Sequence, residues 1–350
     1  MKITKILVAL SFLFAVSTAQ AGEMTVTGNM QATYQSEVDR TTGNPLGMDK
    51  EITFSGSTEL DNGISMSVMQ DFNDQGGFGD AKLTFGNVGG LVDIYVGTDG
   101  SELDAIDDIT PSAFEEANGS GSGTYQDVGG LDTEMGIGIK GSLPILGTIS
   151  AQYVPKADGN GDANGGDDKE SSGDTSASVG SGFELVVRNN MGDLPFVGSL
   201  LDGNSLTLGY AEEEVSTIAD TADRFEITAA ITGSYGNFSY GYQVESIQTG
   251  ETAAQGSSGT SAGDSIEYRV DSIGLAYAVN DALSISYNIM EQKQSSETAD
   301  SSFKQETDAI NIGYTVGGIT LGFQDASTDN AAMVKDSKDD TRTISVKAAF

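Results

Sequence analysis

The sequence contains no cysteine and no histidine among its 350 residues. Without cysteine, no disulfide framework can hold the fold, and no thiol chemistry is available. Without histidine, the chain lacks the commonest general base, the usual catalytic triads and the commonest metal ligand. These two absences argue against an enzyme.

Basic residues are also scarce, with 17 Lys and Arg against 52 Asp and Glu, so the formal net charge is −35. A surface this acidic does not bind nucleic acid, because phosphate contacts need Lys and Arg. The excess of carboxylates instead favours attraction of cations.

Long apolar runs are missing apart from one at the start of the chain. Lys2 and Lys5 precede an apolar stretch at 6–16, which is followed by small residues at Ala19 and Ala21. This order predicts a secretory signal peptide over 1–21, cut after Ala21, because a retained membrane anchor needs about 20 apolar residues. The remaining chain, 22–350, is then soluble or a β-barrel, since only helices and closed barrels satisfy their backbone polar groups in lipid.

Apolar and polar residues alternate with period two along segment after segment. Met24 and Val26 share one face of the first segment, whereas Thr25 and Thr27 share the other. The polar faces are rich in Ser, Thr, Asn, Gln and Glu, which suits a water-filled lumen, so the apolar faces are expected to meet lipid. Most tyrosines have this outward parity, and rings near strand ends indicate aromatic girdles or ordinary strand propensity.

About sixteen segments have the length of a tilted strand that crosses a bilayer. Fourteen or eighteen strands remain open, because 191–204 is an unusually long link and the apolar face changes parity between Tyr268 and Ile273. A bulge or a later strand start would explain that change. The expected strands are 23–36, 50–60, 63–72, 80–87, 91–98, 131–141, 147–155, 182–190, 204–212, 223–234, 237–247, 266–279, 282–292, 304–316, 319–326 and 340–350.

The connections alternate between short and long. Such sorting is typical of an up-and-down barrel whose turns lie on one side of a membrane and whose loops lie on the other. The sequence therefore predicts one all-β domain, a transmembrane antiparallel up-and-down β-barrel over 22–350, with short periplasmic turns and long extracellular loops. The long connections are 37–49, 99–130, 156–181, 248–265 and 326–340.

Two segments carry a resemblance to a known family. The last one, 341–350, alternates and stops at Phe350, so it resembles the closing strand of Gram-negative outer-membrane proteins, whose terminal Phe is read by the barrel-assembly machinery. The hairpin at 82–97, followed by the long connection 99–130, is similar to that of general diffusion porins.

This resemblance implies a sixteen-stranded homotrimer in the outer membrane, in contact with lipid and lipopolysaccharide. It also implies passive diffusion of small hydrophilic solutes and ions through a water-filled channel, which the loop 99–130 narrows by folding inward. By the same resemblance, the trimer interface would take apolar residues of the first and last strands, namely Met24, Val26, Ile344 and Val346.

The loop 99–130 contains acidic residues and no Lys or Arg. Porins of this type set such carboxylates against a basic wall, and a ring of carboxylates predicts cation preference. Thr98, however, follows Gly97 where familiar porins often carry Arg. The acidic candidates are Asp99, Glu102, Asp104, Asp107, Asp108, Glu115, Glu116 and Asp127, and the basic wall candidates are Lys82, Lys140, Arg188 and Arg224, with Arg40 and Lys50 near the mouth.

A second acidic segment, 158–168, superficially resembles a calcium loop through Asp158, Asn160 and Asp162. An EF-hand loop needs Gly at position 6 and Glu at position 12, whereas this chain has Ala163 and Lys169 there. A flexible acidic loop is the favoured interpretation, with no cofactor beyond loosely bound Ca²⁺, which could bridge such loops to lipopolysaccharide.

Three other functions are compatible with parts of the pattern. A solute-specific outer-membrane channel would need an aromatic or binding ladder in its lumen. A secreted β-rich surface adhesin without a pore predicts no sorting of loop lengths. An outer-membrane lipase or protease would need the histidine that the chain lacks.

Overall fold

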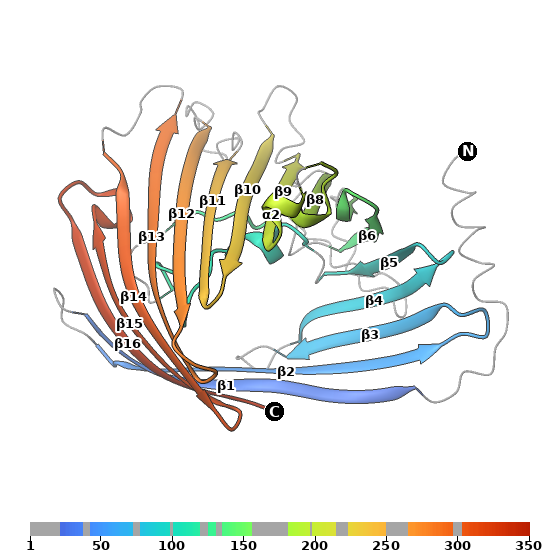
Figure 1. Cartoon of the computed structure of the whole chain (residues 1–350), viewed down its shortest axis with the longest axis horizontal. Coiled ribbons are helices and arrows are strands. Elements are labelled where there is room, and N and C mark those ends of the chain that lie inside the picture. The colour runs from blue at the N-terminus through green and yellow to red at the C-terminus, as the bar shows by residue number, and fades with distance from the viewer. Residues whose placement is uncertain are drawn as a thin grey trace, which may run out of the picture.

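The chain forms a closed, all-antiparallel β-barrel in which each strand pairs with its neighbours in sequence and β1 pairs with β16. Figure 1 shows the strands following one another around this ring, with parts of the segment between β5 and β6 lying behind β9–β13. The structure, a computed structural model, describes residues 22–37, 43–72, 78–98, 101–119, 125–130, 135–155, 181–196, 198–214, 223–249, 265–296 and 303–350.

Sixteen strands lie within these residues, so the predicted number is confirmed and neither fourteen nor eighteen applies. They are β1 (Glu23–Glu37), β2 (Leu46–Glu59), β3 (Ser65–Phe72), β4 (Phe78–Val88), β5 (Val92–Gly97), β6 (Gly136–Leu143), β7 (Gly147–Val154), β8 (Gly182–Asn190), β9 (Asn204–Glu213), β10 (Arg224–Tyr235), β11 (Phe238–Gln248), β12 (Ile266–Ala278), β13 (Leu283–Ser296), β14 (Gln305–Val316), β15 (Ile319–Asp329) and β16 (Lys338–Ala349).

The alternating sequence sorts onto the two faces as predicted. On β14, for example, Ile310 and Ile312 are exposed on the outside, whereas Asn311 between them is fully buried inside the barrel. An outer face of exposed apolar side chains is stable only against lipid, because water would penalise that surface.

Two long connections are shorter than predicted because the adjoining strands extend further. β2 begins at Leu46, so its connection to β1 covers 38–45 rather than 37–49. The connection between β15 and β16 covers 330–337 rather than 326–340. The extra residues lengthen the strands toward the end of the barrel that carries the long connections, here called the long-loop end.

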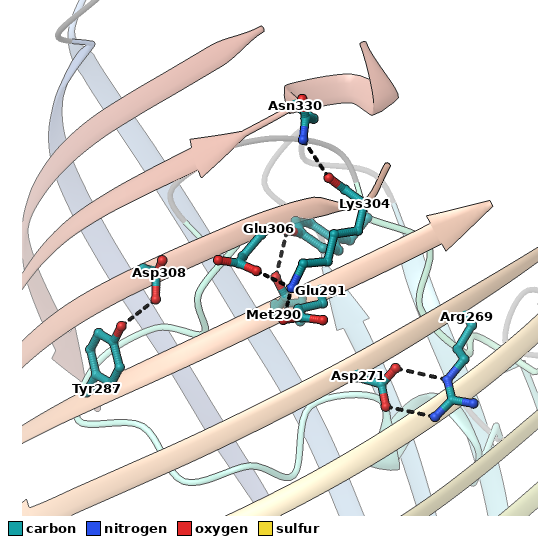
Figure 2. A network of polar contacts seen from close by, with 10 residues as sticks. Arg269, Asp271, Tyr287, Met290, Glu291, Lys304, Glu306, Asp308 and Asn330 are labelled. Atoms are coloured by element: carbon teal, nitrogen blue, oxygen red, sulfur yellow. Dashed lines mark hydrogen bonds and ion pairs between the residues drawn. The ribbon is translucent and has the colours of Figure 1, made fainter. Parts of the chain in front are cut away.

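The expected bulge or late start in β12 is wrong. The register of β12 runs without interruption against both β11 and β13 from Ile266 onward. Its outward face becomes polar near the long-loop end, where Arg269 donates from Nε to Asp271 at 2.9 Å (Figure 2). Val270 faces inward and is buried in an apolar cluster. The parity change therefore reflects an altered environment on each face.

The link between β8 and β9 contains a 3₁₀ turn (Met191–Asp193) and one helical turn, α2 (Gly198–Leu201). It shares the sequence Leu-Pro followed by two apolar residues and Gly with the β6–β7 turn. In both, the residue after Pro has positive φ, 74° at Ile145 and 71° at Phe196, so the two turns are conformationally related. Among the described residues, no helix is both long and apolar enough to cross a membrane.

The barrel closes between its first and last strands. Gly28 and Phe350 exchange two backbone hydrogen bonds of 3.0 Å, and the register then continues from Asn29 opposite Ala349 to Glu37 opposite Thr341. An added Cβ on Gly28 would lie 2.8 Å from the Phe350 ring, so this ring packs directly on the glycine.

Candidate pore-lining site

The segment between β5 and β6 runs along the inner wall of the barrel. We call its described residues 101–116 the outgoing arm. This arm starts at β8, where Arg188 donates to the Ala105 carbonyl at 3.1 Å. It passes β11, where Gln243 donates to the Ile106 carbonyl at 2.7 Å and accepts from the Ile109 amide at 3.3 Å.

The outgoing arm continues across β13 to β15. The Ala113 amide donates to Ser286 Oγ at 2.9 Å, and Asn288 donates to the Pro111 carbonyl at 3.1 Å. Gln324 on β15 then donates to the Glu116 carbonyl at 2.5 Å. Since buried backbone groups need partners, these inward amides and hydroxyls fix the path of the arm.

Residues 125–130, the return arm, lie nearer the long-loop end of the same strands. The Tyr125 hydroxyl lies 2.9 Å from both the Met290 carbonyl and Thr307 Oγ1. The Gln126 amide donates to Gln292 at 2.7 Å. The two arms therefore form one elongated lobe pressed against β8–β15.

The ends of the lobe are held together by two buried glutamates. Glu184 on β8 accepts from Ser101 Oγ at 3.0 Å and from the Glu102 amide at 2.8 Å. Glu226 on β10 accepts from the Gly130 amide at 2.7 Å. Hydrogen bonds to a buried carboxylate are each worth about 1.5–3 kcal/mol, so they attach the lobe strongly. We call Glu184 and Glu226, with the loop groups that they accept from, the clasp.

Two apolar clusters seal the lobe onto the wall. The first joins loop residues Leu103, Ile106 and Val128 to the wall residues Val186, Ala211 and Ile247. The second joins Ala117 and Tyr125 to wall residues Val270, Met290, Ala309 and Ala326. These wall positions are apolar although they face the lumen, because the lobe removes them from water.

The acidic residues of the loop divide into paired and crowded groups. Glu102 is paired with Lys140 at 2.9 Å. Burial, followed by repulsion from Asp108, raises the pKa of both Asp107 and Glu116 to about 8. Burial also raises the pKa of Asp127 and of Glu115.

The crowded carboxyls come from both arms and from the barrel wall. Asp104, Asp108 and Asp127 all repel Asp107, and Glu245 on β11 interacts electrostatically with Asp107, Glu116 and Asp127. At neutral pH, part of the loop's formal negative charge is therefore held as protonated carboxyl. Asp99 lies outside the described residues.

Three of the four basic candidates lie beside the lobe rather than across from it. Lys140 pairs with Glu102, Arg188 bonds the Ala105 carbonyl, and Arg224 is paired with Glu226, which also holds Gly130. Lys82 lies on β4, where its Nζ is 4.5 Å from the centre of the Tyr95 ring.

Of the two basic candidates expected near the mouth, only Lys50 lies within the described residues. Lys50 pairs with Met30 and alternates with inward Glu51, so it lies on the outward face of β2, contrary to its expected place near the mouth. Arg40 lies outside the described residues. Lys347, which sequence reasoning did not select, acts electrostatically on Glu115 from β16.

Two positions near Lys82 are held inside the barrel wall by local contacts. Tyr95 faces the inside of the barrel, beneath Lys82 and against Gly138, so it does not belong to an outer girdle. Thr98 ties β5 to β4, because its Oγ1 accepts from the Ala81 amide at 3.0 Å while its own amide donates to the Ala81 carbonyl at 2.9 Å.

The wall residues that hold the lobe were missed by sequence reasoning, which searched for charge. A usable signal was present, because Val186, Ile247, Val270 and Met290 are apolar at lumen parity. In the part of the chain that the structure describes, no group of three or more acidic side chains is arranged to hold a metal ion. The calcium candidates Asp158, Asn160 and Asp162 lie outside it.

Comparison with known proteins gives one family and several solved structures of similar fold. The sequence matches the Gram-negative porin family over residues 7–317. No curated protein matches it. A porin refined at 1.8 Å resolution is 13% identical with a TM-score of 0.65, covering 94% of this chain and all of the other.

Two further structures are similar at the same level. The outer-membrane-expressed OmpT of Vibrio cholerae is 12% identical with a TM-score of 0.65, covering 96% of this chain and all of its own. An anion-selective porin from Comamonas acidovorans is 14% identical with a TM-score of 0.61, covering 94% of this chain and all of its own. Identities this low show the fold alone, and that fold is compatible with anion selectivity.

The family match covers most of the chain, and the closed barrel with an inward segment agrees with it. Porins are channels of the outer membrane rather than enzymes. The chain therefore belongs to the Gram-negative porin family.

Proposed function

We propose that this porin lets small hydrophilic solutes and ions diffuse passively across the outer membrane, with a preference for cations, and that no chemistry accompanies transport. The main observation behind this proposal is that the described charged residues of the lobe are all carboxylic acids. Three nearby wall cations are engaged with the lobe or its clasp, which leaves them less able to attract anions. A water-filled passage lined in this way favours positive ions.

Reversal potentials across a planar bilayer in a salt gradient test this preference. The expected potential has the sign of cation flow, and it should move toward zero when Asp104 and Asp108, both exposed on the lobe, are replaced together by Asn. Glu59→Gln on β2 is the matched control, since it removes one exposed inward carboxylate far along the wall from the lobe. A potential with the sign of anion flow would overturn the proposal.

We further propose a homotrimer whose interface uses the outward residues of β1 and β16. Met24, Val26, Ile344 and Val346 are all exposed on that face, with Met24 73% exposed, so they are available either to lipid or to another copy. A heat-modifiable trimer on a gel is expected. Met24→Arg together with Val346→Arg should yield monomers, and trimers that persist would contradict this interface.

Lipopolysaccharide contact is proposed for the polar band outside the barrel at the long-loop end. There, Lys304 is paired with Glu291 and Glu306, and Tyr287 donates to Asp308 (Figure 2). Alternating charges of both signs at headgroup height suit a phosphorylated sugar surface bridged by divalent ions. Calcium should raise the unfolding temperature in lipopolysaccharide vesicles; an unchanged temperature would exclude such bridging.

Export and assembly complete the proposal. The signal peptide 1–21 would be removed after Ala21, which N-terminal sequencing of the membrane-inserted protein tests, and a start other than Gly22 would refute that site. Phe350 would act as the barrel-assembly signal. Its exposed ring on the seam is accessible, at 68% exposure, and Phe350→Ser should lower the inserted fraction.

A solute-specific channel is the alternative. It needs lumen-facing rings or a ladder of binding groups, but Tyr95 is only 2% exposed and so offers its ring to Lys82 rather than to a solute. Conductance that saturates at low solute concentration would favour the specific channel over general diffusion.

A further inference from the structure

The lobe rests on inward-facing glycines that come in cross-strand pairs. Gly241 on β11 lies opposite Gly274 on β12, and Gly313 on β14 lies opposite Gly322 on β15. All four are buried under the outgoing arm. Glycine inside a strand weakens it and commonly marks the close approach of another backbone, so two adjacent pairs beneath one loop need an explanation.

The first pair lies beneath Thr110 and Pro111. A Cβ added to Gly274 would lie 2.6 Å from the Pro111 carbonyl oxygen and 2.9 Å from its nitrogen, whereas ordinary contacts begin near 3.4 Å. A Cβ on Gly241 would lie 2.6 Å from Pro111 Cδ and 3.2 Å from the Thr110 Cα. These neighbours belong mainly to the loop's backbone and a proline ring, which cannot rotate away.

The second pair lies beneath Ala113 and Phe114. A Cβ on Gly313 would collide with the Ala113 carbonyl, and one on Gly322 would collide with the Phe114 ring. Between the two pairs, β13 contributes Ser286 and Asn288, which bond the Ala113 amide and the Pro111 carbonyl. The wall thus alternates glycine pair, hydrogen-bonding strand and glycine pair beneath the five consecutive loop residues 110–114.

We propose that these four glycines are the residues that set the free cross-section of the channel, because they let the loop backbone at 110–114 lie directly on the barrel wall. A side chain at Gly241, Gly274 or Gly313 would meet the loop backbone or the Pro111 ring and must lift the arm toward the lumen, and one at Gly322 must displace the Phe114 ring. The width that remains for solutes is the distance from the arm to the opposite wall, so lifting the arm narrows the passage. The proposal rests on the channel function.

Gly274→Ala and Gly274→Leu test the proposal in planar bilayers. We expect single-channel conductance and the largest permeating neutral sugar to fall below wild type for Ala and further for Leu. Gly47→Ala is the matched control, because Gly47 also faces inward but its added Cβ would meet only the Thr33 side chain. Heat-modifiability on gels reports whether each barrel has folded.

These measurements distinguish failure of the channel function from failure of the proposed role of the glycines. Wild type that does not conduct refutes the channel function itself. Conducting wild type with both Gly274 variants folded and unchanged in conductance and sugar cut-off refutes the role of the glycines. A rise in conductance in a folded Gly274 variant also refutes the proposal, because an arm lifted by the added side chain would narrow the passage.

A disulfide provides a second test that does not depend on bulky variants folding. The Oγ atoms of Ser112 and Ser286 lie 3.3 Å apart, and the chain has no cysteine of its own. Ser112→Cys with Ser286→Cys should oxidise spontaneously, given how close the two side chains are. The oxidised protein should conduct like the reduced one if the arm rests on the wall in the open channel. A large conductance change on reduction would overturn the proposed resting position.

Discussion

Two parts of the same inner wall differ sharply in composition. On β8–β15, inward residues beneath the lobe include Gln243, Gln324 and Asn288 as hydrogen-bonding partners and Val186 and Val270 as apolar contacts, and all are buried. On β1–β3, the inward face includes short hydroxylated residues that are exposed to the lumen, namely Thr25, Thr27, Ser57, Ser65 and Ser67.

This difference shows that inward parity alone does not make a residue a pore lining. Where the lobe covers the wall, the barrel has an interior like that of a soluble protein, with paired amides and apolar clusters. Where the lobe is absent, the wall is wetted and its side chains meet solutes. A charged substitution should therefore displace the lobe where the lobe covers the wall, and should leave the structure unchanged where the wall is exposed.

The largest effect is expected from a charge placed under the lobe. Val186→Asp would bury an unpaired carboxylate among Leu103, Ile106 and Val128, at a cost of about 3 kcal/mol or more. The lobe should leave the wall, with a rise in conductance and new protease cleavage between 101 and 130. Thr27→Asp on the exposed wall is the control and should leave both unchanged; equal behaviour of the two variants would abolish the distinction between the walls.

A smaller effect is expected from opening the clasp. Glu184→Ala removes the acceptor for Ser101 Oγ and for the Glu102 amide, and each such bond contributes about 1.5–3 kcal/mol. Hydrogen exchange of the 101–109 amides should accelerate, and current fluctuations should increase. Glu59→Ala, on the wall that the lobe does not cover, should change neither. Unaltered exchange in the Glu184 variant would mean that the clasp does not hold the lobe.

The crowded carboxyls of the lobe predict a pH dependence of ion selectivity. The pKa values of Asp107 and Glu116 are near 8, so both carboxyls gain charge as pH rises from 6 to 9, and cation preference should strengthen over that range. The folded lobe keeps these two carboxyls protonated up to about pH 8, whereas an unfolded chain releases the same protons near pH 4. The free energy of unfolding should therefore fall as pH rises from about 4 to about 8. Asp107→Asn with Glu116→Gln should flatten the reversal-potential profile. A profile as steep as wild type in this variant would assign the titration to other groups.

The smallest effect is expected at Lys82. Its contact with Tyr95 is worth about 0.5–1 kcal/mol, too little to move the wall. Lys82→Met removes one lumen cation, so it should raise cation preference slightly at constant conductance. Lys338→Met, which removes a cation from the outward face at the long-loop end, is the control for net charge. If both shift the reversal potential equally, the position of the charge in the lumen does not matter.

Most of the barrel could be predicted from sequence because period two is a local signal. Strands such as β8 and β13 were located to within a few residues from that alternation alone. The parity change in β12 was misread because sequence does not say that Val270 has an apolar partner inside the barrel. That partner is a loop more than 140 residues earlier, so its contact is non-local.

The candidate site was predictable in location but not in arrangement. The acidic loop was recognised from its length and charge, yet whether Arg188 faces the loop or holds it depends on which wall the loop follows. The wall that the loop follows is determined by residues such as Gly274, Asn288 and Glu184, and each of these residue types is common in a barrel strand. Their role in holding the loop is recognised only when the strands are placed side by side.

The seam between Gly28 and Phe350 bears on the order of events during assembly. All other strand pairs join neighbours in sequence and can form as hairpins, but this one joins residues 28–37 to 341–350. Loop closure across more than three hundred residues is slow, and until it happens β1 and β16 both present unpaired edges. Until residues 341–350 are in place, β1 lacks its partner on this side and the barrel cannot close.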